Sequence, residues 1–75
     1  MLASEFPLKR LVGRRVRTLR AFADIPKGTT GIIDEHYNIG QSHSGVMVKW
    51  DAPHTVRDGF GRDDEFDETK WLEVI

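Results

Sequence analysis

The sequence contains no cysteine, so neither a disulfide nor a thiolate metal site can stabilise the fold. It also lacks any apolar run near the roughly 20 residues needed to span a bilayer. The segment MLASEFPLKR at the start has no basic region followed by an apolar stretch, which a signal peptide requires. We therefore expect a cytoplasmic protein without membrane association.

A chain of 75 residues forms one domain at most. At this size, folding buries only about 60% of the surface that the unfolded chain exposes, so the core is thin. A hydrophobic content of 39% beside 31% charged residues is typical of a globular domain and argues against disorder. Self-association as a homodimer is one way to cover apolar surface that so thin a core leaves exposed.

No convincing long helix is present, and the apolar residues alternate as they do in strands. Val16 and Thr18 share one face of the first segment, with arginines on the other. Val46, Val48 and Trp50 likewise line one face of the clearest strand. Short strands are predicted over residues 14–20, 29–36, 45–50, 55–62 and 71–75. Five strands in about 60 residues predict an all-β protein, a small barrel.

The sequence also predicts the structure of the segment before these strands and of two segments between them. Residues 1–12 form an arm or a short helical turn beginning at Pro7, separate from a barrel domain over residues 13–75. The apolar residues Phe6, Leu8 and Leu11 are expected to cap one open end of the barrel. Phe22 and Ile25 are expected to anchor the loop 21–27, and a single helical turn fits the acidic segment 63–69.

The order of these segments resembles the SH3-like barrels. The first hairpin resembles the KOW pattern, in which glycines precede an alternating strand and open the next one, here at Gly13, Val16, Gly28, Gly31 and Ile32. The segment 45–51, the following arginine-glycine stretch and the terminal Leu72-Glu73-Val74 resemble the mind-bomb/HERC type of module. Similar barrels occur in the β subunit of nitrile hydratase. The resemblance covers residues 12–75 and implies a five-stranded SH3-like barrel. Unlike KOW modules, this chain has one basic residue in the loop 21–27 and an acidic final third.

Charge is strongly polarised along the chain. Residues 1–22 carry six basic residues and one acidic residue, whereas residues 51–75 carry eight acidic and three basic residues. The basic cluster could grip phosphates, with Phe22, Tyr37 or Trp50 stacking on bases. Alternatively it pairs internally, because neighbouring first and last strands would place Arg15 and Arg17 beside Glu73 and near the acids at 63–68. The candidate phosphate-binding residues are Arg14, Arg15, Arg17 and Arg20.

A second candidate site lies around the long polar loop 37–45. Tyr37 and Ile39 have no evident structural duty there, and long loops on small rigid barrels often carry binding function. With Trp50 and Phe60 nearby they predict a shallow aromatic groove for a peptide. Trp50 also fits a position in the core.

Catalytic and metal-binding patterns are weak. His36, His43 and His54 have spacings that match no structural zinc pattern. The acidic run 63–68 lacks the glycine and alternating ligands of a calcium loop, and Gly59-Phe60-Gly61 is too short for a phosphate loop. No Ser/His/Asp arrangement can be picked out. We therefore expect no catalytic site, metal or cofactor.

These patterns predict a non-enzymatic binding or accessory module that acts through a protein partner. Two alternatives remain open. One is a KOW-like nucleic-acid binder that uses the strand Arg14–Arg20, and the other is a small subunit or docking piece of a larger enzyme.

Overall fold

The computed structural model describes residues 1–63 and 65–75. The elements in chain order are the 3₁₀ turns η1 (Ala3–Glu5) and η2 (Leu8–Arg10), the strands β1 (Arg15–Thr18), β2 (Thr30–Tyr37), β3 (Ser44–Trp50) and β4 (Arg57–Arg62), the 3₁₀ turn η3 (Glu68–Trp71) and the strand β5 (Leu72–Val74). The predicted all-β class with five strands is confirmed. Strand ends differ from the predicted ranges by at most two residues.

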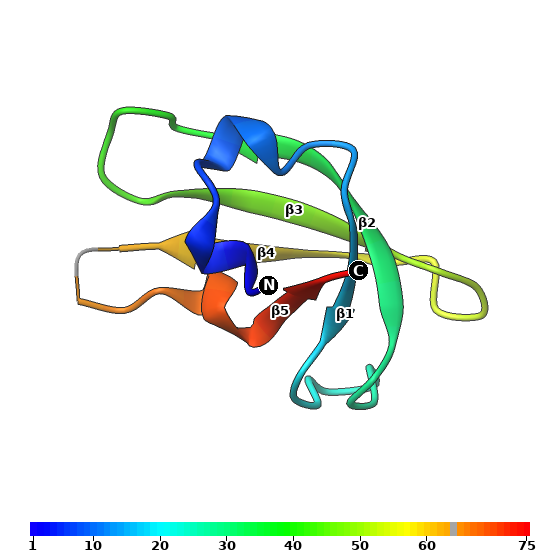
Figure 1. Cartoon of the computed structure of the whole chain (residues 1–75). Helices are drawn as coiled ribbons and strands as arrows, with labels where there is room; N and C mark the ends of the chain where they lie inside the picture. The colour runs from blue at the N-terminus through cyan, green and yellow to red at the C-terminus, as the bar shows by residue number, and fades with distance from the viewer. Residues whose placement is uncertain (64) are drawn as a thin grey trace.

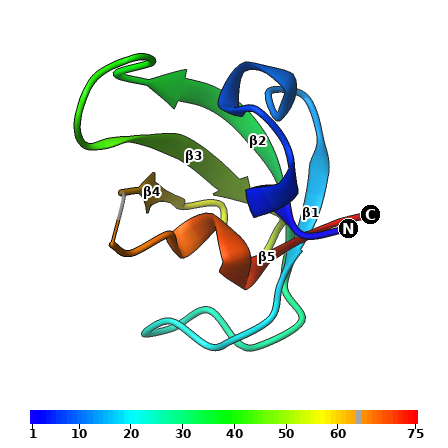
Figure 2. The ribbon, with the colours of Figure 1, turned by 60° about the vertical axis from the view of Figure 1, so that its left-hand side comes forward.

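The five strands form one antiparallel sheet in the order β4-β3-β2-β1-β5. The sheet curls strongly, and Figure 1 shows the first residues crossing its concave side. Within the described residues, the edge strands β4 and β5 are not paired with each other, so backbone pairing does not close the sheet. Figure 2 shows the two chain ends side by side, where the Val74 amide donates to the Met1 carbonyl at 2.7 Å.

The alternation read from the sequence matches the two faces of the sheet. Val16 and Thr18 are buried, whereas Arg15 and Arg17 point outward. Val46, Val48 and Trp50 are buried on β3, as predicted. The core consists mainly of residues from the concave face and the N-terminal arm: Ala3, Leu8, Leu11, Val16, Ile25, Ile33, Val46, Val48, Trp50, Phe60 and Leu72.

The arm, residues 1–12, forms part of this core. It contains two 3₁₀ turns, with Pro7 immediately before the second one rather than within it. Leu8 and Leu11 are buried, and Phe6 packs against the core, as expected of residues that cap its open side. Because the arm covers apolar side chains on the concave face, it takes the place of a further structural layer.

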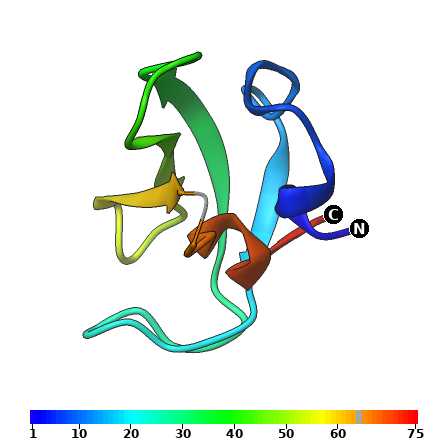
Figure 3. The ribbon, with the colours of Figure 1, turned by 90° about the vertical axis from the view of Figure 1, so that its left-hand side faces the viewer.

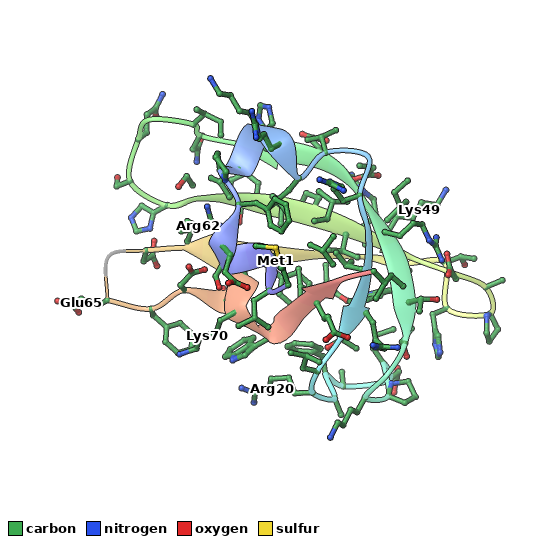
Figure 4. All side chains as sticks on the ribbon, viewed as in Figure 1. Met1, Arg20, Lys49, Arg62, Glu65 and Lys70 are labelled. Atoms are coloured by element: carbon green, nitrogen blue, oxygen red, sulfur yellow. The ribbon has the colours of Figure 1, made fainter. Side chains whose placement is uncertain are left out.

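Arg62, at the end of β4, ties this arm to the rest of the protein (Figure 4). Its guanidinium donates to the carbonyl of Phe6 at 2.7 Å and to that of Ala3 at 2.9 Å. It also donates to the Thr69 hydroxyl at 3.1 Å and lies 3.5 Å from the Asp67 carboxylate. One side chain therefore joins the arm, β4 and η3.

The chain between β4 and β5 was predicted to contain a helical turn within residues 63–69. The turn instead runs from Glu68 to Trp71, because the Asp67 carboxylate accepts from the Thr69 amide at 2.9 Å and caps it there. Asp64, which belongs to the predicted turn, lies outside the described residues.

The loop between β1 and β2 projects from one end of the sheet (Figure 3). Phe22 and Ile25 exchange two backbone hydrogen bonds of 2.9 and 2.6 Å across a tight turn. Ile25 is buried and Phe22 packs against the core, so both anchor the loop as predicted. Within the residues that the structure describes, no helix is long and apolar enough to cross a membrane.

Replacing Arg62 with methionine is expected to lower the free energy of unfolding by about 2–4 kcal/mol, because the partly buried carbonyls and carboxylate lose a charged donor. Urea denaturation measures this change. Arg10→Met is the control, since Arg10 is exposed on η2. Equal losses in the two variants would contradict the role assigned to Arg62.

Candidate functional site

Two of the four candidate arginines on or beside β1 form ion pairs with acidic residues. Arg15 donates to both oxygens of the Asp51 carboxylate, with one contact of 2.8 Å. Arg17 forms an ion pair with Glu73, its direct partner in the register between β1 and β5. These contacts hold the pKa of Asp51 at about 2 and lower the pKa of Glu73.

The predicted pairing of Arg17 with Glu73 is confirmed, but the predicted pairing of Arg15 with Glu73 is wrong. Glu73 lies opposite Arg17, so Arg15 reaches diagonally across β2 to Asp51 at the end of β3. The acids at 67 and 68 serve other groups. Asp67 pairs with Arg62, and Glu68 accepts from the Gly61 amide at 3.1 Å.

The other two arginines lie over aromatic rings. The guanidinium carbon of Arg14 is 5.2 Å from the centre of the Phe6 ring. That of Arg20 lies 4.2 Å from the centre of the Trp71 ring and 5.7 Å from that of Phe22. The four arginines therefore have different local partners and do not present one uniform row of unpaired charges.

Tyr37 packs across glycines on the convex face of the sheet. It pairs directly with Gly45, where a side-chain Cβ would collide with the Tyr37 hydroxyl oxygen. The hydroxyl also lies near Gly59 and Gly61 of β4. Partial burial and the negative charges of Glu68 and Asp63 raise the pKa of Tyr37. Tyr37 therefore fills space that these glycines leave.

The structure does not bring the remaining members of the predicted aromatic groove to one surface. Trp50 and Phe60 are each 1% exposed and pack edge to face in the core at 6.0 Å between ring centres. The indole nitrogen of Trp50 donates to Asp58 at 2.7 Å. Ile39 is exposed in the loop between β2 and β3. Trp50 thus occupies the core position that the sequence also allowed.

A different set of aromatic and basic side chains meets at the surface near η3. Trp71 and Phe66 pack edge to face, with 5.3 Å between ring centres. Arg20 lies over the ring of Trp71, and the ammonium nitrogen of Lys70 lies 5.6 Å from the centre of the Phe66 ring. We call the four residues Arg20, Trp71, Phe66 and Lys70 the aromatic-cation row.

Backbone contacts fix the row to the sheet. The Leu19 amide donates to the Trp71 carbonyl at 2.8 Å, which brings the end of β1 beside η3. The buried Thr18 hydroxyl donates to the Arg20 carbonyl at 2.6 Å. Phe22 contacts both Phe60 in the core and Trp71, at 5.2 and 5.7 Å between ring centres. The inner half of the row is therefore held by the core.

The outer half of the row is open to solvent. Phe66, in the outer half, is 50% exposed. Figure 4 shows Arg20 and Lys70 on the same side of the molecule. The row therefore offers an apolar centre with a cation at each end, which is a surface suited to noncovalent binding.

The sequence drew attention to only part of this row. The sequence marks Arg20 as a candidate phosphate ligand, but it places Phe66 within an acidic helical turn and Trp71 in the last strand. The available signal was an aromatic residue embedded among acids, followed by Lys70-Trp71. Their proximity to Arg20 depends on the pairing of β1 with β5, which local sequence does not display.

A shallow open cleft of about 770 Å³ borders the row at Phe66. It lies between the loop after β2 and the residues that follow β4, and His43 and Asp63 approach within 3.8 Å there. Among the described residues, His, Asp and Glu form no group of three or more that could hold a metal ion.

Comparison with known proteins finds no matching family model, no matching curated protein and no matching solved structure.

The ion pair between Arg15 and Asp51 predicts a pH-dependent contribution to stability. In the unfolded chain Asp51 takes up its proton near its usual pKa of 3.8, whereas the folded protein resists protonation until about pH 2. Stability from this pair is therefore present above pH 3.8 and is lost as the pH falls through that window. Urea midpoints measured across the window should fall less steeply for Asp51→Asn and for Arg15→Gln. Slopes identical to the native protein would contradict the pairing.

The close approach of Tyr37 predicts that Gly45 tolerates no side chain. Gly45→Ala is expected to lower the free energy of unfolding by about 1–3 kcal/mol, because the new Cβ meets the Phe60 carbonyl and the Tyr37 ring. Gly59→Ala is the matched control, since its Cβ would meet the flexible end of Met47 at 3.3 Å and the Tyr37 hydroxyl at an ordinary contact distance of 3.7 Å. Urea denaturation should show a change within about 1 kcal/mol for the control. A free energy of unfolding that Gly45→Ala leaves unchanged would contradict the close packing of Tyr37 against Gly45.

Proposed function

We propose that this chain is a non-enzymatic protein-interaction module that binds its partner through the aromatic-cation row. The observation that carries the proposal is Phe66, a large aromatic side chain half exposed at the surface and packed edge-on against Trp71. Aromatic and arginine side chains are the residue types that contribute most to protein interfaces. Because Trp71 is held against Phe22, the binding surface is largely formed before a partner arrives.

We further propose that the scaffold is an SH3-like barrel. The neighbouring first and last strands, the antiparallel order and the curled sheet support this assignment. The arm and η3 lie against the concave side, where Arg62 joins them across the gap between the edge strands. The fold alone does not specify a function, so the functional argument rests on the surface.

The nucleic-acid alternative has less support. A phosphate-binding strand needs cations whose charge is available, but Arg15 and Arg17 each pair with a carboxylate. Arg14 packs on Phe6 and Arg20 on Trp71, which places them at opposite ends of β1. A role as the docking piece of an enzyme needs no separate surface, since a large enzyme is one kind of protein partner.

Selection of a random peptide library displayed on phage tests the proposal directly. Peptides enriched by the native protein should lose affinity about tenfold or more with Phe66→Ser, because the exposed ring supplies the apolar contact. Val56→Ser is the matched control, since Val56 is 51% exposed and lies outside the row. It should change affinity by less than about twofold.

Two results would overturn this proposal. One is the absence of any enriched peptide, and the other is enrichment that depends on Val56 and not on Phe66. A mixed-sequence RNA titrated at low and near-physiological salt provides the opposing test. The nucleic-acid function would be favoured if the RNA still binds the native protein at near-physiological salt and if replacing Arg14 or Arg17 abolishes that binding.

A further inference from the structure

We propose that the aromatic-cation row recognises a short acidic peptide segment in which an apolar side chain lies between carboxylates. The apolar side chain covers Phe66, one carboxylate binds the guanidinium of Arg20, and another approaches Lys70. This inference rests on the proposed function and names the chemistry of the partner.

Arg20 is the residue that specifies a carboxylate. Its guanidinium lies with its carbon 4.2 Å from the centre of the Trp71 ring. Stacking of this kind engages the face of the guanidinium and leaves the N–H groups at its edge available. Within residues 1–63 and 65–75, that guanidinium donates no hydrogen bond, in contrast to Arg15, which donates to both oxygens of Asp51. A carboxylate from a partner can therefore form the same two-pronged contact at Arg20.

The orientation of Arg20 is set before binding. Its backbone amide donates to the Thr18 hydroxyl oxygen at 3.3 Å, and its carbonyl accepts from that hydroxyl at 2.6 Å. Trp71 supports one side of the guanidinium and is itself linked to Leu19 through the backbone. A side chain that is already ordered loses less conformational entropy on binding, which favours affinity for a small ligand.

Lys70 extends the same recognition to the other end of the row. Its ammonium lies over Phe66, the ring that contacts Trp71 edge-on. The order along the surface is therefore cation, ring, ring, cation, and its complement is an anion, an apolar group and an anion. Charge complementarity of this kind steers binding and fixes the register of the partner.

The geometry favours a peptide over a nucleic acid. The planes of Phe66 and Trp71 meet at 75°, so the two rings do not form parallel platforms for successive bases.

The test uses three labelled synthetic peptides and fluorescence polarisation at low and near-physiological salt. The acidic probe has the central sequence Asp-Glu-Leu-Phe-Asp-Glu. The neutral probe replaces its acids with Asn and Gln, and the basic probe replaces them with Lys. We expect the acidic probe to bind about tenfold or more tightly than the neutral one, with no binding of the basic probe.

Variants assign the effect to Arg20. Arg20→Ala should weaken the acidic probe about tenfold, and Arg20→Lys should weaken it less, because charge is kept while the planar pair of donors is lost. Arg10→Ala removes an exposed cation elsewhere on the surface and should leave the affinity within about twofold. Urea midpoints of all three variants separate loss of binding from loss of folding.

Several outcomes would overturn the inference, and they are distinct from failure of the proposed function. If the acidic and neutral probes bind equally and Phe66→Ser abolishes the binding of both, the proposed interaction surface stands. The proposed preference for an acidic peptide is then wrong. Equal weakening by Arg10→Ala and Arg20→Ala would indicate nonspecific attraction only. Tighter binding of oligo-uridine than of the acidic probe at near-physiological salt would assign the anion site to nucleic acid. Binding of none of the probes would also overturn the inference, while the library selection decides the proposed function separately.

Discussion

The guanidinium of Arg62 is the contact on which the arrangement of this small protein depends. The sheet leaves its edge strands unpaired with each other, so the concave side has to be covered by short segments with little structure of their own. Arg62 holds two of these segments by donating to the carbonyls of Phe6 and Ala3 and to the Thr69 hydroxyl. Its side chain is 23% exposed, and the nearby Asp67 carboxylate offsets the cost of placing a charge there. A single polar side chain thereby aligns the arm with the turn that carries the aromatic-cation row.

The distribution of charge along the chain has a mainly structural explanation. The basic first strand and acidic final third meet on the sheet, where Arg17 pairs with Glu73, while Arg15 pairs with Asp51. Exposed pairs of this kind contribute little stability individually, but they disfavour other strand registers. Because Arg15 and Arg17 are paired with carboxylates, the proposed recognition depends on the cations that lie over aromatic rings instead. Arg20 is the member of the original basic cluster that combines a cation, an exposed apolar neighbour and a fixed orientation.

The aromatic residues explain why the site was harder to predict than the strands. The sequence allowed Trp50 either a core position or a place in an aromatic groove with Phe60, and the structure packs both rings in the core. The sequence predicts only an acidic turn around Phe66, whereas half of the surface of this ring is exposed. An aromatic ring fits a core or an interface equally well by composition. The choice depends on which residues cover it, and covering residues come from distant parts of the chain.

By itself, the sequence determined the all-β class, the number of strands and the inward face of β1 and β3. These follow from alternation with a period of two, which is a local property of the chain. Only the tertiary structure decided which acid each arginine meets, and that Arg20 stacks on Trp71 at the far end of the sequence. The physical reason is that strand order and register bring distant residues together. Local alternation fixes which way a side chain points, but not what it meets.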